Sequence, residues 1–390
     1  MMDYKNTLSS VAQGIAPSGI RKFFDLLDEM KDVTSLTVGQ PDFATPWHIR
    51  EAAIDAISAG KTYYTSNAGL ADLRNEIATY MKRRFGLEYE GKKEVTVTVG
   101  GSEAIDIAMR AILDPGDEVI IPVPSFVCYG PIAILAGAKP IYVTLEEKDD
   151  FKLTPEKLEE AITEKTKLLV LPFPNNPTGS VMTREDLEKI ADVIRSKSIY
   201  VLSDEIYAEL SYGISHASIA SIEGMRERTV IASGFSKAYA MTGWRLGYTL
   251  APAPITEQML KIHQYAIMCS PTASQYAGIE ALRAGDEDIE YMRNEYNRRR
   301  TFILKGLRDT GIECYEPKGA FYVFPNIKKF GLSSEEFCSR LLYEGGVAIV
   351  PGTAFGECGE GFARISYAYS VKHIMSALEK ISEFTDKLSK

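Results

Sequence analysis

Two basic residues follow an apolar run in the middle of the sequence and are candidates for chemistry. Lys237 and Arg245 come after residues 229–232, whose β-branched and apolar side chains predict a buried strand. Burial disfavours the charged form of an amine, and a neutral lysine amine attacks carbonyl groups. The arginine suits a phosphate, which a guanidinium binds through two parallel hydrogen bonds. By spacing alone, a loop lysine and a surface arginine would be the simpler interpretation.

Other polar residues follow further predicted strands, at the ends where ligands of open parallel sheets bind. Gly101 and Ser102 open a helical pattern after the alternating segment 95–99, and a helix N-terminus can bind a phosphate. A plain capped helix explains them equally well. Asp204 follows a buried strand, where a carboxylate is costly unless paired, although helix capping is an alternative. Asn176 lies in an Asn-Pro-Thr-Gly turn that needs no ligand.

The elements that must position these residues form an alternating pattern of strands and helices. A helix is predicted for residues 183–195, with Thr183 and Asp186 as a capping box. Short apolar segments separated by helices predict an α/β fold with a largely parallel, doubly wound sheet of seven strands. The predicted strands are residues 95–99, 118–123, 140–145, 167–173, 199–203, 229–233 and 246–251.

A long charged helical stretch, residues 287–311, ends this alternation. The segments 321–324, 347–350 and 363–367 then read as strands with helices between them, which predicts a smaller α+β domain. Near the N-terminus, residues 20–30 are amphipathic and residues 35–38 are extended in pattern. The chain is therefore expected to contain a large and a small domain.

Composition narrows the class of protein. The net charge of −9, without a dense basic tract, argues against nucleic acid as a partner. Five cysteines without a C-x-x-C spacing fit thiols in a reducing compartment, and four scattered histidines give no metal-site pattern. The N-terminus does not resemble a signal peptide, and no apolar run reaches membrane-spanning length. We expect a cytoplasmic protein with no metal and no membrane partner.

Residues 234–247 resemble the pyridoxal-phosphate lysine motif of class I/II aminotransferases, the fold-type I enzymes. That motif asks for Gly or Ser, an apolar and a small residue, Lys, and then small-x-Arg-apolar-Gly, and the segment fits at each of these positions. Many members place a phosphate-binding serine where Gly234 stands, so Ser233 or Ser236 could substitute for it, and the sequence does not assign either. Segments 18–23, 39–43 and 64–69 are similar to a prokaryotic subgroup of aspartate, aromatic and N-acetyl-diaminopimelate aminotransferases.

The resemblance implies a domain division and a set of cofactor contacts. In the family the N-terminal arm packs with the C-terminal part, so the large domain is expected at 49–287 and the small domain at 1–48 plus 288–390. Lys237 is expected to bind pyridoxal 5'-phosphate covalently and then to act as the general base. Asp204 is expected to keep the pyridine nitrogen protonated. The other implied cofactor contacts are Gly101, Ser102, Phe126, Asn176, Tyr207, Arg245 and, from the neighbouring subunit of a homodimer, Tyr64.

The implied substrate contacts are Gly39, Asn176 and Arg364, which hold the α-carboxylate. The expected reaction is ping-pong transfer of an amino group from an L-amino acid to a 2-oxo acid, with 2-oxoglutarate as the acceptor. Some aspartate-specific relatives carry a lysine at the position of Ser102, so the donor is expected to be aromatic or N-acetyl-diaminopimelate-like. Arg21 or Lys22 could restore a charge for aspartate.

Two other functions fit the same resemblance. A pyridoxal-phosphate-dependent carbon–sulfur β-lyase shares the fold but needs no 2-oxo acid acceptor and releases ammonia. A non-catalytic pyridoxal-phosphate sensor would carry a DNA-binding domain before the first motif, where this chain has fewer than twenty residues. Aminotransfer is the expected function.

Overall fold

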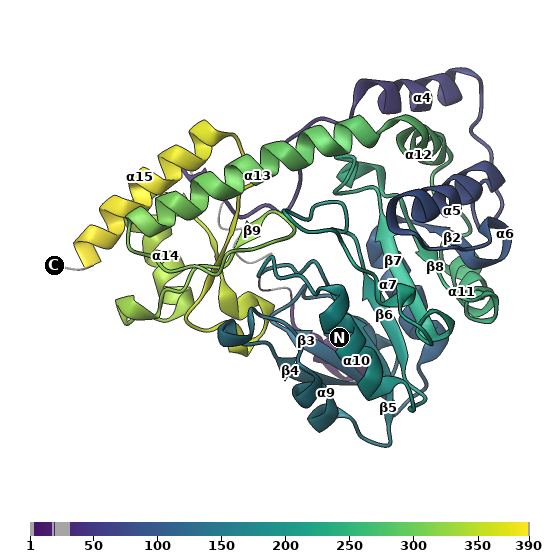
Figure 1. Cartoon of the computed structure of the whole chain (residues 1–390), viewed down its shortest axis with the longest axis horizontal. Helices are drawn as coiled ribbons and strands as arrows, with labels where there is room; N and C mark the ends of the chain where they lie inside the picture. Colours follow the sequence, from purple (N-terminus) through teal and green to yellow (C-terminus); the bar gives the residue numbers. More distant parts are fainter. Residues whose placement is uncertain (1–3, 18, 20–31, 389–390) are drawn as a thin grey trace.

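The computed structural model describes residues 4–17, 19 and 32–388, and its centre is a sheet of seven strands (Figure 1). The order is β2-β8-β7-β6-β5-β3-β4, and β8 runs antiparallel to both neighbours while the remaining pairs are parallel. The largely parallel sheet and each of its predicted strands are therefore confirmed. The strands are β2 (Val95–Thr98), β3 (Glu118–Val123), β4 (Lys139–Thr144), β5 (Thr166–Leu171), β6 (Tyr200–Asp204), β7 (Thr229–Gly234) and β8 (Gly247–Leu250).

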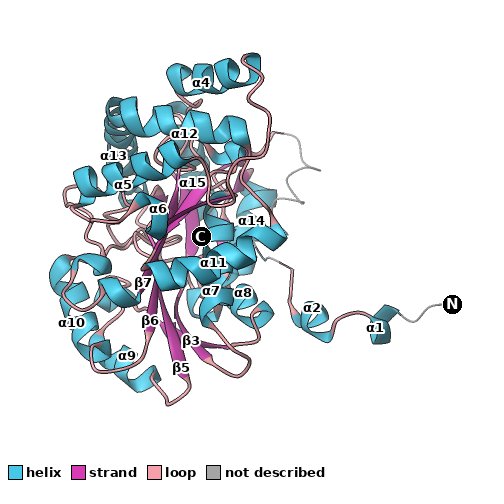
Figure 2. Ribbon diagram, turned by 90° about the vertical axis from the view of Figure 1, so that its right-hand side faces the viewer, coloured by secondary structure: helices cyan, strands magenta, loops and turns pink. Residues whose placement is uncertain are grey.

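Helices cover both faces of the sheet (Figure 2) because alternate strand residues are apolar on each side. One face packs against α7 (Gly100–Ile112), α8 (Tyr129–Leu135) and α11 (Ala253–Ala266). The other face packs against α5 (Ala71–Phe85), α9 (Pro155–Ala161), α10 (Arg184–Ile194) and α12 (Thr272–Ala284). Helix α4 (Trp47–Ser58) lies on α12, and α6 (Gly91–Glu94) precedes β2.

The predicted capping box is present at the start of α10. The Thr183 hydroxyl accepts from the Asp186 N–H, and the Asp186 carboxylate accepts from the Thr183 N–H at 2.9 Å. The buried face of this helix packs against the sheet through Leu187, Ile190 and Ile194. The local sequence thus fixes both where the helix begins and which face it buries.

A second core lies beyond the large sheet, around α13 (Asp286–Asp309), α14 (Ser334–Gly345) and α15 (Val371–Leu388). It holds an antiparallel sheet in the order β11-β12-β9, formed by Val350–Pro351, Ala363–Ser366 and Tyr322–Val323. Strand β1 (Thr34–Ser35) pairs in parallel with β10 (Val347–Ala348), so an N-terminal segment joins the C-terminal part. This pairing agrees with an N-terminal arm that joins the C-terminal part, while the domain division at 48/49 and 287/288 stays a prediction.

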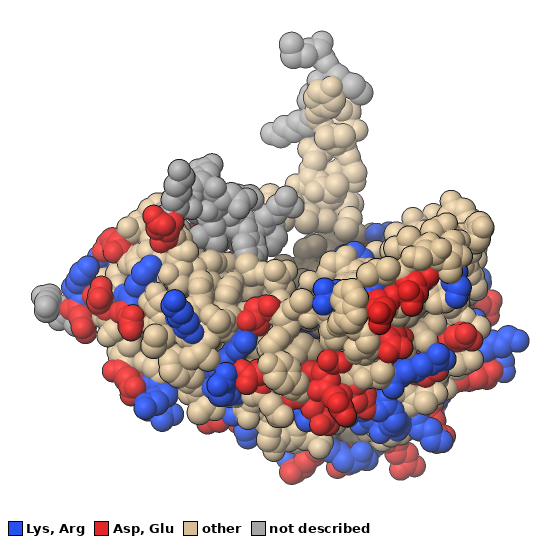
Figure 3. All heavy atoms as spheres, turned by 90° about the horizontal axis from the view of Figure 1, so that it is seen from above, with Lys and Arg blue, Asp and Glu red and all other residues tan. Residues whose placement is uncertain are grey.

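The N-terminal helices α1 (Tyr4–Thr7) and α2 (Ser10–Gly14) project from the body (Figure 2). The amphipathic segment predicted at 20–30, with Arg21 and Lys22, lies outside the described residues. Within the described ranges, no helix is long and apolar enough to span a membrane. On the face in Figure 3, basic and acidic side chains are interspersed, so this face offers no continuous basic surface.

Candidate active site

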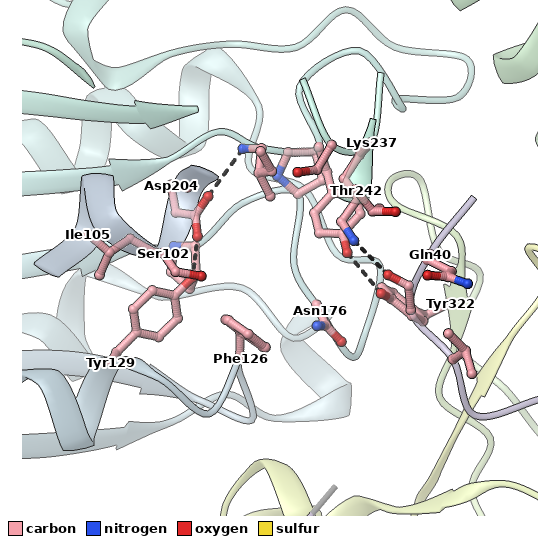
Figure 4. A pocket seen from close by; sticks show the side chains of 18 of the residues that line it. Gln40, Ser102, Ile105, Phe126, Tyr129, Asn176, Asp204, Lys237, Thr242 and Tyr322 are labelled. Atoms are coloured by element: carbon pink, nitrogen blue, oxygen red, sulfur yellow. Dashed lines mark hydrogen bonds between the residues drawn. The ribbon is translucent and has the colours of Figure 1, made fainter. Parts of the chain in front are cut away.

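A cavity of about 390 Å³ lies at the carboxyl ends of β5, β6 and β7 and extends to β9 and β12 of the second core (Figure 4). This volume falls within the usual range of small-molecule sites. Tyr64 does not line the cavity in the single chain, where its side chain is 81% exposed. The other predicted site residues are brought together there: Gly39, Gly101, Ser102, Phe126, Asn176, Asp204, Tyr207, Lys237, Arg245 and Arg364.

Lys237 follows β7 and points its amine into the cavity. Nζ donates a hydrogen bond to the Gly39 carbonyl oxygen at 2.6 Å. Burial, followed by the positive charges of Arg364 and Arg245, lowers the pKa of the lysine to about 8, although Asp204 opposes this shift. About a tenth of the amine is therefore neutral at pH 7, far more than for a lysine with an ordinary pKa.

Asp204 ends β6 and is buried. Oδ2 accepts a hydrogen bond from the Tyr129 hydroxyl at 2.7 Å, and Oδ1 accepts one from the Ile206 N–H at 3.2 Å. Burial raises the pKa of this carboxyl, and the bonds from Tyr129 and Ile206 only partly offset that effect. A buried carboxylate at a cavity wall is well placed for a cationic ring nitrogen as its partner.

The first turn of α7 forms another wall of the cavity. Gly100 has φ = +77°, and a Cβ atom there would lie 2.6 Å from Nη2 of Arg245. The arginine side chain thus lies against the turn, and its Nη1 donates to the Thr242 carbonyl at 3.1 Å. A guanidinium beside a helix N-terminus provides the donors that a phosphate needs.

The two candidate serines differ in position. Ser236 lines the cavity, whereas Ser233 does not and its hydroxyl donates to the Glu205 carbonyl oxygen at 3.4 Å. Gly234 packs against Gly247, because a Cβ atom added to Gly234 would lie only 2.9 Å from the Cα atom of Gly247. Of these two serines, only Ser236 therefore faces the cavity that the first turn of α7 also lines.

Arg364 lies on β12 at the opposite end of the cavity and is buried. Nη1 donates to the Asn176 side-chain oxygen at 3.0 Å, and Nη2 donates to the Thr37 carbonyl. Its guanidinium lies 4.6 Å from the ring centroid of Tyr322 and 4.9 Å from that of Phe355. Nε is buried without a partner among the described residues, which suits a site for an incoming carboxylate.

Aromatic residues line the space between these ends. Phe126 lies on the cavity wall, with its ring edge-to-face to Tyr129 at 6.3 Å between centroids. The Tyr207 hydroxyl is 2.8 Å from the Tyr322 hydroxyl. Figure 4 shows Asp204 with Tyr129 toward one side of the cavity and Tyr322 with Gln40 toward the other.

Sequence reasoning missed four polar cavity residues, namely Gln40, Tyr129, Thr242 and Tyr322. The clearest available signal was at Gly39, because a Cβ atom there would lie 2.3 Å from the Tyr322 hydroxyl oxygen. A glycine in a polar turn can indicate such a close approach, but the sequence does not name the residue that approaches.

The sequence and the fold of this chain are similar to those of known proteins. Residues 31–381 match the family model described as aminotransferase class I and II. The chain is similar to an aspartate aminotransferase of Pyrococcus abyssi, with 47% identity over 96% of each chain. It is also similar to a probable N-acetyl-LL-diaminopimelate aminotransferase of Bacillus subtilis, with 44% identity over 98% of this chain and 97% of the relative. Among solved structures, an aromatic aminotransferase from Pyrococcus horikoshii matches with a TM-score of 0.90 and 44% identity over 94% of this chain and 99% of that chain.

The fold and cavity are those of a fold-type I enzyme, and the chain belongs to the class I and II aminotransferases. It is a transaminase that depends on pyridoxal phosphate, as this family does, and it acts on amino-acid and 2-oxo-acid substrates. The carbon–sulfur lyase and sensor alternatives are not favoured. The cavity fits the cofactor, because it offers a partly neutral lysine amine, a buried carboxylate and an arginine at a helix N-terminus.

Proposed function

We propose that this aminotransferase accepts an aromatic or N-acetyl-diaminopimelate-like L-amino acid as donor and 2-oxoglutarate as acceptor. The observation that supports the assignment of roles is the position of Lys237, whose amine lies in one cavity with the buried carboxylate of Asp204 and the buried guanidinium of Arg364. Both substrates use this one cavity in turn, which gives ping-pong kinetics.

The chain's residues would hold the cofactor at its ring nitrogen, its phosphate, its ring face and its phenolic oxygen. When bound, pyridoxal phosphate supplies an electron sink for the charge left on the substrate Cα after its proton is removed. Asp204, held by Tyr129, pairs with the ring nitrogen. Arg245 and the first turn of α7 bind the phosphate. The other cofactor contacts are Phe126 on the ring face, Tyr207 and Asn176 at the phenolic oxygen, and Ser236 near the phosphate.

Arg364 binds the substrate α-carboxylate, and its bonds to Asn176 and Thr37 fix the guanidinium before the substrate arrives. The Gly39 backbone lies beside this position and accepts a hydrogen bond from the Lys237 amine. Lys237 Nζ then takes the proton from Cα. A pKa of about 8 suits this step, because a general base works best when its pKa is close to the ambient pH.

The donor assignment depends on the charges of the cavity. Ser102 is neutral and lines it, and the cations that line it are Lys237, Arg245 and Arg364, each of which already has a proposed role. Arg21 and Lys22 are not among the described residues and are not part of this count. A missing buried charge-assisted contact costs about 2–5 kcal/mol, roughly 30-fold to more than 1,000-fold in discrimination. Aspartate should therefore be a poorer donor than an aromatic amino acid, whose side chain has no carboxylate.

Half-reaction spectroscopy tests this assignment. The absorbance of the bound cofactor is followed after mixing with aspartate, phenylalanine, tyrosine or N-acetyl-LL-diaminopimelate, without an acceptor. We expect at least one aromatic or N-acylated donor to react about tenfold faster than aspartate. The Ser102→Lys variant is the matched comparison and should shift the preference toward aspartate. If aspartate outpaces every other donor by an order of magnitude, the Ser102 argument is wrong.

We also propose a homodimer in which Tyr64 reaches the cofactor phosphate of the partner subunit. Tyr63, Tyr64 and Tyr265 are 79%, 81% and 88% exposed in the single chain, and such exposure of neighbouring aromatic rings is typical of an interface. Hydrogen bonds from Asn67 to the Met268 carbonyl and from Thr272 to the Tyr63 carbonyl join the two segments that carry these rings.

Light scattering and cofactor titration test the dimer. The wild type should have twice the chain mass at micromolar concentration, and Tyr64→Ala should bind pyridoxal phosphate about 10- to 100-fold more weakly through loss of a hydrogen bond to a charged group. Tyr343→Ala, which removes a similarly exposed ring on α14, is the control and should leave the affinity unchanged. A fully active monomer would contradict the proposal.

The described cysteines are all unpaired thiols. Disulfides are rare in reducing compartments, where thiols persist. We propose a cytoplasmic location on this basis, and fractionation of the source cells tests it.

A further inference from the structure

A histidine and a glutamate that have no part in the mechanism lie on the buried side of the phosphate-binding turn. His263, on α11, has a fully buried side chain, and its Nδ1 is 2.6 Å from Oε1 of Glu103. Its Nε2 is buried and has no partner among the described residues. A fully buried imidazole with a single hydrogen bond is costly, which indicates that its contact with Glu103 has a specific role.

Glu103 connects this histidine to the turn. It lies in the first turn of α7, and its Oε2 accepts a hydrogen bond from the Val99 N–H, the residue directly before the helix. The Thr98 hydroxyl donates to the Gly100 carbonyl at 3.0 Å in the same turn. The Val99 N–H and the Gly100 carbonyl are thus engaged within the protein, which fixes the path of the chain into the helix.

The residues that follow face the cavity. Gly101 and Ser102 both line it, and their N–H groups have no intrahelical acceptor because they belong to the first turn. The direction in which these two N–H groups point depends on the turn that Glu103 holds. A shift of that turn would misalign them with an anion in the cavity.

The negative charge of Glu103 gives its contact with His263 a second consequence for phosphate binding. A glutamate in the first turn of a helix carries a negative charge close to any phosphate bound there, and like charges repel. Glu103 does not line the cavity, because its carboxylate is turned away toward His263 and the Val99 N–H. Without the histidine, the carboxylate would lose one of these two donors and be less firmly held away from the phosphate site.

We propose that His263, acting through Glu103, is a positioning residue for the turn that binds the phosphate of the cofactor. This inference depends on the cofactor assignment made above. The histidine gives Glu103 a buried donor, Glu103 holds the Val99 N–H, and the turn presents the Gly101 and Ser102 N–H groups to the phosphate.

Two substitutions at His263 separate this role from simple core packing. Asn places a donor where Nδ1 stands, whereas Leu fills similar space without a donor. We expect His263→Leu to bind pyridoxal phosphate about tenfold more weakly in titrations of the apoenzyme, and to bind inorganic phosphate alone more weakly by a similar factor. His263→Asn should stay within about threefold of the wild type in both titrations.

His48 provides the matched control. It bridges Glu280 at 2.8 Å and Asp288 at 2.9 Å, and these contacts join α4 to α12 and α13, away from the turn. His48→Leu should lower the melting temperature but leave the affinity for pyridoxal phosphate and for inorganic phosphate unchanged. An affinity loss equal to that of His263→Leu would show a general packing effect and overturn the proposal.

A second pair of variants serves if His263→Leu does not fold. Glu103→Gln keeps an acceptor for the Val99 N–H and should retain the affinity for phosphate, whereas Glu103→Leu should lose about tenfold. The positioning role would be overturned if His263→Leu bound phosphate as tightly as His263→Asn, and Glu103→Leu as tightly as Glu103→Gln. The cofactor assignment would still stand in that case, provided that the wild-type apoenzyme binds pyridoxal phosphate. A wild-type apoenzyme that does not bind pyridoxal phosphate would instead contradict that assignment itself.

Discussion

The Lys237→Ala variant should lose transamination by about 10⁴-fold, the upper range for removal of a positioned general base. Asp204, Arg245 and the first turn of α7 are unchanged in this variant, so it should still bind pyridoxal phosphate, but without a covalent bond. The visible absorbance of the covalently bound cofactor should therefore be absent while the cofactor remains with the protein after gel filtration. Absorbance spectra and single-turnover rates measure both effects.

Lys261→Ala is the control for this variant. Lys261 lies on α11 and pairs with Glu257 at 3.5 Å on the surface, so its loss should change neither the spectrum nor the rate. Normal turnover of Lys237→Ala would contradict the assignment of Lys237 as the general base. Loss of the cofactor altogether would instead count against the proposed phosphate and ring contacts, because these contacts are unchanged in the variant and are expected to hold the cofactor.

The sequence predicted the large sheet well because each strand is a short apolar run bounded by turn residues. Residues 118–123 and β3 coincide, and the other predicted strands differ from the observed ones by at most two residues at either end. The antiparallel direction of β8 could not be predicted from the sequence. An apolar run indicates burial but not the neighbouring strand, and β8 lies antiparallel between β2 and β7, which are far apart in the sequence.

The site residues that the sequence could suggest are those that follow predicted strands. Asp204 and Lys237 belong to this class, because the ends of parallel strands meet at one edge of the sheet. Tyr129, Tyr322 and His263 do not, since their roles arise from contacts between elements distant in the chain. The Tyr129 hydroxyl meets Asp204 across 75 positions and His263 meets Glu103 across 160, and neither contact leaves a local pattern.

Asp204→Asn should slow removal of the Cα proton by ~10²-fold or more, because an uncharged amide cannot stabilise a protonated ring nitrogen. A factor of 10² corresponds to about 2.7 kcal/mol, which is within reach of a buried charge pair. Asparagine keeps the side chain's shape and can still accept from Tyr129 or from the Ile206 N–H, so the fold should be retained. Single-turnover measurement of the half-reaction isolates this step from acceptor binding and product release.

Two further variants show whether the charge of Asp204 or the packing around it is responsible for the slower removal of the Cα proton. Tyr129→Phe removes only the 2.7 Å hydrogen bond to Asp204 and should slow the same step by less than tenfold. Glu205→Gln alters the adjacent buried carboxylate, which accepts from Ser203 and Ser218 and does not line the cavity, so its rate should stay close to wild type. An unchanged rate in Asp204→Asn would mean that Asp204 only caps the segment after β6. A loss as large in Glu205→Gln would mean that the effect arises from disturbed packing of β6 and not from the charge that faces the cofactor.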